Sequence, residues 1–117
     1  MVSRSLLIPI ILLLSYNFLQ ASPKAWVGKN PVSMGESFRF FIEVENEEGP
    51  REPDLLVLKD LKVLNRSVQN QTSIVGTKFS RKVSWTYELV AMRSGKIIIP
   101  ELRAGKGFTQ SIMLEVL

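Results

Sequence analysis

The sequence of 117 residues contains neither cysteine nor histidine. Their absence removes the commonest general base, the best thiol nucleophile and the usual ligands of zinc. A serine nucleophile needs a base beside it, and the lysines that flank Ser80 would point away from the protein if this segment is a strand. We therefore predict no catalytic residue, no bound metal, no cofactor and no enzymatic activity.

Long apolar runs are scarce as well. One run occupies residues 6–14 (LLIPIILLL), after a short start that carries Arg4 and before the small residue Ala21. A membrane-spanning helix needs about 20 apolar residues, whereas a charged start, a short apolar middle and a small residue at the exit are typical of a secretory signal peptide. We predict a signal peptide over residues 1–21 and one exported domain over residues 22–117, with an uncleaved N-terminal anchor as the alternative.

The missing cysteines also bear on the compartment. Small exported domains often depend on disulfides, so this domain would be held by packing and sheet hydrogen bonds alone. That favours the bacterial periplasm over a eukaryotic extracellular space. The net charge of +4 is only weakly basic, and export disfavours a nucleic-acid partner.

Alternation of apolar and polar residues, typical of half-buried strands, dominates the exported part. Residues 38–45 place four apolar side chains on one face, and residues 79–91 place Phe79 and a longer apolar set on theirs. We predict a core that includes Phe38, Phe40, Ile42, Val44, Val83, Trp85, Tyr87, Leu89, Ile112 and Leu114.

Turn signals divide the chain between these segments. Gly76-Thr77, between residues 72–75 and 78–91, predicts a β-hairpin because glycine supplies the positive φ of a tight turn. The acidic, proline-containing residues 46–54 predict a loop, and residues 108–116 predict a last alternating strand. About seven short strands with regular turns indicate an all-β fold, an immunoglobulin-like antiparallel β-sandwich.

Phe41 is the clearest candidate for a contact surface, because it lies on the polar face of its strand between Arg39 and Glu43. An outward phenylalanine is either covered by a loop or part of a binding surface. We predict an interaction surface made of Arg39, Phe41 and Glu43, and note that an edge strand could also accept a partner strand. A carbohydrate- or surface-binding sandwich is the alternative.

Two charged clusters have simpler interpretations. An acidic cluster could hold Ca²⁺, which takes six to eight oxygen ligands, but it fits no calcium-loop motif and a solvated loop is the better interpretation; it comprises Glu45, Glu47, Glu48, Glu52 and Asp54. A basic cluster could contact anionic lipid or an acidic partner, although solubilising surface is commoner; it comprises Lys59, Lys62, Arg66, Lys78, Arg81 and Lys82.

Four segments, in order, resemble the BatD (aerotolerance, or oxygen tolerance) family of envelope proteins. Residues 26–38 (WVGKNPVSMGESF) contain the Asn-Pro-Val and Gly-Glu pieces of the family's opening. Residues 53–64, 84–89 (SWTYEL) and 93–100 (RSGKIIIP) resemble three later pieces, although Leu61 stands where an aromatic is usual. The resemblance covers nearly all of the exported part.

The resemblance implies an N-terminal, immunoglobulin-like domain of a periplasmic, inner-membrane-associated protein. It implies partners among membrane von Willebrand factor A proteins and a MoxR-type AAA+ ATPase system, and a non-catalytic role in oxygen or stress tolerance. The family's C-terminal transmembrane helix is not found before Leu117. A fragment, a truncated product or a stand-alone variant is therefore expected.

Overall fold

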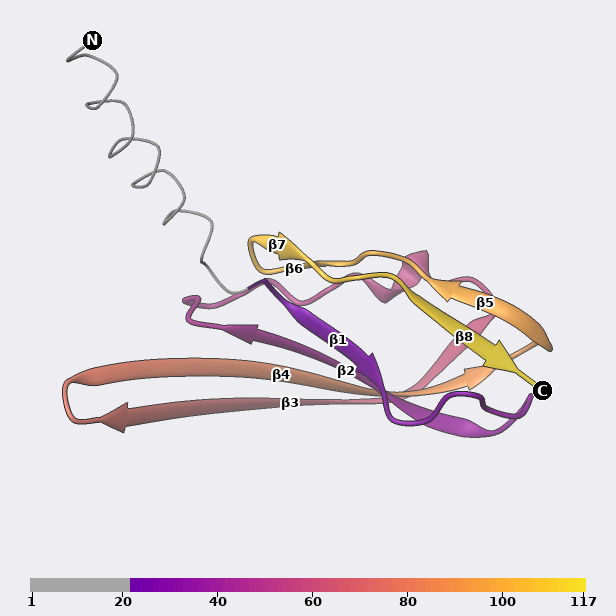
Figure 1. Cartoon of the computed structure of the whole chain (residues 1–117), viewed down its shortest axis with the longest axis horizontal. Coiled ribbons are helices and arrows are strands. Elements are labelled where there is room, and N and C mark those ends of the chain that lie inside the picture. The colour runs from indigo at the N-terminus through magenta and orange to yellow at the C-terminus, as the bar shows by residue number, and fades with distance from the viewer. Residues whose placement is uncertain (1–21) are drawn as a thin grey trace, which may run out of the picture.

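The chain folds into antiparallel strands of 2 to 15 residues that form two layers (Figure 1). The computed structural model describes residues 22–117, and the predicted signal peptide lies outside the described residues. In chain order the elements are β1 (Lys24–Val27), β2 (Ser37–Glu45), the 3₁₀ turn η1 (Leu55–Val57), β3 (Leu61–Val75), β4 (Lys78–Ala91), β5 (Gly95–Ile99), β6 (Arg103–Ala104), β7 (Gly107–Phe108) and β8 (Ile112–Val116).

The larger layer is a four-stranded antiparallel sheet in the order β1-β2-β4-β3. β2 pairs with β4 along its whole length, from Ser37 opposite Val90 to Glu45 opposite Lys82. Because side chains alternate between the faces of a strand, this register puts the apolar residues of both strands on one face. That face is the floor of the core.

The second layer consists of two two-stranded ribbons, β5–β8 and β6–β7, which lie over the larger sheet (Figure 1). Buried residues of both layers form one apolar cluster. The cluster contains Phe38, Phe40, Ile42, Val44, Val83, Trp85, Tyr87, Leu89 and Leu114, and Ile112 packs against it while only partly buried. The predicted all-β, antiparallel sandwich is confirmed.

The linker between β1 and β2 joins the two layers. Val32 forms a parallel bridge with Val116 of β8. Two residues earlier, the Asn30 side chain makes the two hydrogen bonds to the β8 backbone that a neighbouring strand would make. Its Nδ2 donates to the Met113 carbonyl at 2.9 Å, and its Oδ1 accepts from the Glu115 N–H at 3.0 Å. The Asn-Pro-Val piece of the sequence thus closes one end of the sandwich.

The predicted loop after β2 follows the edge of the sandwich, where its carboxylates pair with neighbouring groups. Asp54 caps η1 by accepting from the Leu56 N–H at 2.9 Å. Glu52 forms an ion pair with Arg66 of β3, and Glu47 accepts from the Lys106 N–H at 3.0 Å. These acidic residues therefore have structural partners in η1, in β3 and in the turn between β6 and β7.

β3 and β4 form the predicted hairpin around Gly76, which has φ of 61°. The hairpin extends past the end of β2, because β2 reaches only the level of Lys82. We call residues 72–81, which pair only with each other, the arm; it projects at the left of Figure 1. Phe79 has the parity of the inward face, but it is 58% exposed because no second layer reaches it.

Two predicted boundaries differ from the structure. β3 is one strand of 15 residues that begins at Leu61, whereas the sequence predicted only residues 72–75 as the first arm of the hairpin. The predicted last strand is divided, since Phe108 belongs to the β6–β7 ribbon and β8 begins only at Ile112. Thr109 explains the break: its Oγ1 accepts from the Leu102 N–H at 2.9 Å and its N–H donates to the Leu102 carbonyl at 2.8 Å.

Among the residues that the structure describes, no helix has the length and apolar character needed to cross a membrane.

Candidate interaction surface

The predicted surface residues Arg39, Phe41 and Glu43 lie on β2, on the side of the larger sheet that faces away from the core. We call this side the outer face. The register brings Trp26 of β1 opposite Phe41 and Glu88 of β4 opposite Arg39. The outer face therefore combines residues of β1, β2 and β4 that lie far apart in the sequence.

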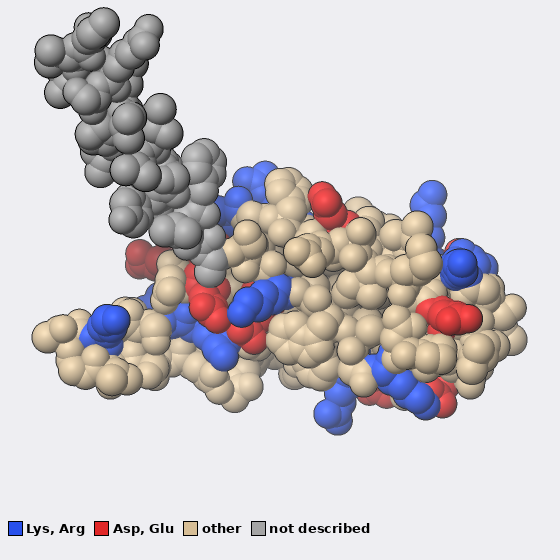
Figure 2. All heavy atoms as spheres, in the orientation of Figure 1, with Lys and Arg blue, Asp and Glu red and all other residues tan. Residues whose placement is uncertain are grey.

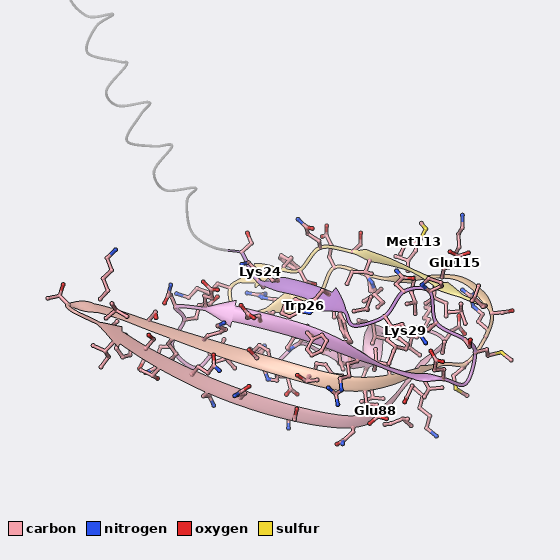
Figure 3. All side chains as sticks on the ribbon, turned by 60° about the horizontal axis from the view of Figure 1, so that its bottom comes forward. Lys24, Trp26, Lys29, Glu88, Met113 and Glu115 are labelled. Atoms are coloured by element: carbon pink, nitrogen blue, oxygen red, sulfur yellow. The ribbon has the colours of Figure 1, made fainter. Side chains whose placement is uncertain are left out.

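Phe41 is partly covered, and its cover comes from β1. The Trp26 and Phe41 rings stack with centroids 5.3 Å apart and planes 17° from parallel. Gly28 leaves room on the same ring, because a Cβ there would lie 3.4 Å from Phe41 Cε2. Trp26 itself remains 42% exposed (Figure 3), so the stack presents an aromatic surface at the β1 edge of the sheet.

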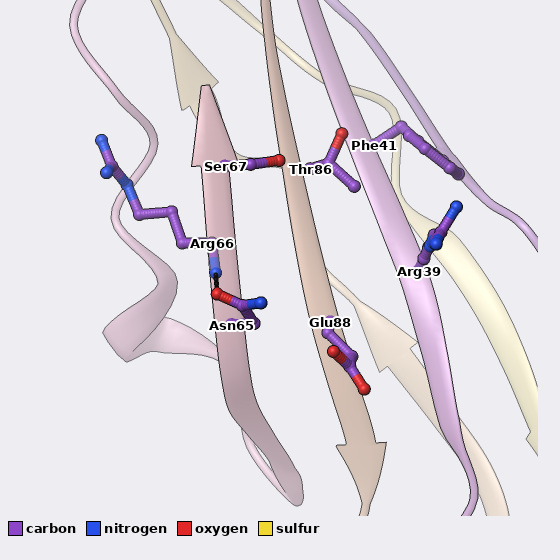
Figure 4. A pocket seen from close by; sticks show the side chains of 7 residues that line it. All are labelled: Arg39, Phe41, Asn65, Arg66, Ser67, Thr86 and Glu88. Carbon is purple, nitrogen blue, oxygen red and sulfur yellow. Dashed lines mark hydrogen bonds between the residues drawn. The ribbon is translucent and has the colours of Figure 1, made fainter. Parts of the chain in front are cut away.

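A shallow hollow of about 360 Å³ lies beside this stack on the outer face (Figure 4). It is bounded by Arg39 and Phe41 of β2, by Asn65, Arg66 and Ser67 of β3, and by Thr86 and Glu88 of β4. The hollow therefore offers an aromatic edge, hydroxyls, an amide and both signs of charge within one depression.

The charges of the outer face are only loosely paired. Glu43 approaches Lys82 at 3.7 Å, which is long for a charge-assisted hydrogen bond. Arg39 and Glu88 face each other in register, yet the described residues include no ion pair between them. Within residues 22–117 no three acidic side chains converge to hold a metal ion. The outer face is thus suited to hydrogen bonding and to aromatic stacking.

The arm and the neighbouring edge of β3 form a second exposed surface. All residues of β3 after Leu61 are exposed, and β3 is an edge strand that pairs only with β4. Ile74 and Val75 are 71% and 72% exposed. The arm contains Lys78 and Arg81 but no carboxylate, and its end is tan and blue in Figure 2. Arg81 also lies over the Phe79 ring, at 5.7 Å from its centroid.

Sequence reasoning identified Phe41 but missed its partner Trp26. The contact between Trp26 and Phe41 could have been found only from the pairing of β1 with β2. In that pairing the short strand before Gly28 runs antiparallel to residues 37–45 and places Trp26 opposite Phe41. The hollow was also missed, since it depends on the position of β3 relative to β2. Alternation within single strands carries no information on which strands are neighbours.

The fold defines a small antiparallel β-sandwich domain with two exposed surfaces. Residues 25–116 match the family model described as the BatD DUF11-like domain. The chain therefore belongs to the BatD family. Neither the curated proteins nor the solved structures include a significant match to this chain.

Proposed function

We propose that this chain is a non-catalytic protein-interaction module of a BatD-like complex in the bacterial cell envelope, with a role in oxygen or stress tolerance. The family match over residues 25–116 carries the proposal. The exposed surfaces support it physically, because a free strand edge and an aromatic, mixed-charge face are both suited to binding another protein.

The proposed partners are those that the family resemblance suggests, namely von Willebrand factor A membrane proteins and a MoxR-type AAA+ ATPase system. The proposed location is the periplasm, at the inner membrane. If residues 1–21 are a signal peptide that is removed on export, the N-terminus of the purified protein should be Ser22. An N-terminus at Met1 would instead support the uncleaved anchor.

The test is capture from the native cell. The chain, tagged at its C-terminus, is crosslinked in living cells, purified and analysed by mass spectrometry. An unrelated exported β-sandwich with residues 1–21 and the same tag serves as the control. Enrichment of von Willebrand factor A proteins or of the ATPase over this control is the expected result. Enrichment of no envelope protein would contradict the proposal.

A carbohydrate- or surface-binding module is the second candidate, and the Trp26–Phe41 stack favours it. Aromatic rings next to planar polar side chains such as Arg39 and Glu88 are the groups that can stack on a sugar ring and bond its hydroxyls. On a glycan array or in a cell-wall pull-down, Phe41→Ala should remove the binding. Phe108→Ala is the matched control, because Phe108 is exposed on a different ribbon. Absence of binding by the unaltered chain would reject this candidate.

A further inference from the structure

The outer edge of β3 changes character along its length. Its first part has the protections that edge strands commonly have: a bulge between Val63 and Asn65, the cation Lys62, and Arg66, which points inward to its partner Glu52. Its second part, residues 68–75, has no charged residue, no proline, no glycine and no register shift. The first part is therefore protected against strand addition, and the second part is open to it.

The open part also offers hydrogen-bonding groups. In an antiparallel ladder, successive residues alternate between bonding the neighbouring strand and pointing away from it. Since β3 pairs with β4 on one side only, about half of the N–H and C=O groups of residues 68–75 face outward. The other sheet edge of the same layer, β1, has only four residues. Residues 68–75 are thus the longer docking edge of this layer.

The charges around this edge indicate the occupant. Residues 68–82 contain Lys78, Arg81 and Lys82 and no carboxylate. These cations lie on β4, one strand behind the edge, and Lys82 also approaches Glu43 at 3.7 Å. Two copies of the chain joined edge to edge would place the two sets of cations in one sheet, about three strand spacings of 4.8 Å apart, where they would repel each other weakly. An added segment that carries acidic residues would lie about two spacings from the same cations, near the roughly 10 Å screening length of 0.1 M salt, where the interaction is attractive. Charge complementarity therefore favours a different, acidic partner over a second copy.

The side chains on the two faces of the sheet around residues 68–75 indicate which side chains the added segment would carry. Ile74 lies opposite Phe79, and Val68 lies opposite the core residue Trp85, so the inward side of this edge is apolar at both ends, with the polar residues Asn70 and Thr72 between them. Lys78 and Lys82 have the opposite parity, on the side of the outer face. A strand that alternates apolar and acidic residues would match both sides at once.

We propose that residues 68–75 of β3 bind an extended segment of a partner protein by adding it as a fifth antiparallel or parallel strand, with alternating apolar and acidic side chains. This inference rests on the proposed function, because it assigns the surface through which the module binds its protein partner.

A defined probe tests the inference without knowledge of the partner. The full chain is mixed with a blocked synthetic nonapeptide in which valine alternates with glutamate, or with its twin that has lysine in place of glutamate. Binding is measured by fluorescence anisotropy, and amide hydrogen exchange locates the bound segment. We expect slower exchange in residues 68–75 and unchanged exchange in residues 61–66. The lysine twin should bind at least tenfold more weakly.

Two pairs of variants provide the controls. Ile74→Glu should weaken binding of the glutamate peptide at least tenfold, whereas Ile98→Glu should leave it unchanged. Ile98 is a fair match because it is an exposed isoleucine on a strand of the other layer, 61% exposed against 71% for Ile74. Gln71→Glu and Gln110→Glu repeat the comparison with a change that conserves shape. Equal binding of both peptides, protection outside residues 68–75, or no binding would overturn the inference.

Other occupants are separate outcomes. A dimer in sedimentation that Ile74→Glu dissociates would assign the edge to a second copy. Binding to phosphatidylglycerol vesicles that Ile74→Glu abolishes would assign it to a membrane. Either result overturns the proposal of an acidic protein segment.

Capture from the native cell separates this inference from the proposed function. If the unaltered chain and Ile98→Glu enrich the same envelope protein and Ile74→Glu loses it, both are supported. If all three enrich it equally, the module binds its partner elsewhere and the edge assignment is wrong. If none enriches any protein, the proposed function fails, and the peptide experiment still decides whether the edge accepts an acidic strand.

Discussion

The two ends of β4 follow the same alternating pattern but have different surroundings. From Val83 to Ala91 every second side chain is buried in the core. From Lys78 to Arg81, in the arm, the same parity leaves Phe79 exposed. The change occurs where β2 ends: the Asn46 N–H donates to the Arg81 carbonyl at 2.7 Å, and Asn46 adopts a positive φ of 58° as the chain turns away.

This difference shows that alternation specifies a strand but does not specify its cover. The burial of an apolar face depends on whether a second layer passes over it. In this chain the second layer ends before the arm, so an apolar residue there becomes part of an exposed surface. Stability should therefore depend on one end of β4, and binding on the other.

The largest expected effect separates the two ends directly. Trp85→Ala should lower the free energy of unfolding by about 3–5 kcal/mol, because it leaves a cavity in the core. Phe79→Ala should change it by less than about 0.5 kcal/mol, as expected for an exposed position. Chemical denaturation of both variants measures the contrast. Similar losses from both would mean that the arm is packed against another part of the protein.

A smaller effect is expected from a buried hydroxyl. Thr109→Val should cost about 1–3 kcal/mol, because it leaves the buried Leu102 N–H without the acceptor that it has at 2.9 Å. Thr72→Val in the arm is the matched change, and it should be neutral or slightly favourable because valine suits an exposed strand. Thermal unfolding of the two variants, with Thr109→Ser as a variant that retains the hydroxyl, tests this. A loss as large in Thr109→Ser as in Thr109→Val would exclude the hydrogen bond as the cause.

Much of the fold could be predicted from local patterns. The strand at residues 37–45, the hairpin around Gly76 and the inward set on β4 follow from period-two alternation and turn chemistry. The division of the last strand could not be predicted, because it depends on the contact between Thr109 and Leu102. The same applies to the candidate surface. Phe41 could be recognised by its polar neighbours, whereas the Trp26 stack and the hollow depend on the order β1-β2-β4-β3.

Tyr87 is the exception within the buried half of β4. Its side chain is in the core, but its hydroxyl has no hydrogen-bond partner among the described residues. Burial, with a smaller contribution from the negative charge of Glu52, raises the pKa of Tyr87 well above the ordinary value of a phenol. The buried hydroxyl is therefore unfavourable for folding, and its ionised form even more so.

Tyr87→Phe should therefore stabilise the protein by about 1 kcal/mol at neutral pH, since it removes an unpaired buried polar group and retains the ring. The gain should grow above about pH 10, where the phenol ionises in the unfolded chain but not in the folded one. In that range the unfolded state binds fewer protons than the native state, so the stability of the unaltered chain falls as pH rises. Urea denaturation of both proteins at pH 7 and at pH 10.5 measures the difference. A destabilised Tyr87→Phe would show that the hydroxyl has a hydrogen-bond partner after all. The buried half of β4 would then contain no buried side-chain polar group without a hydrogen bond.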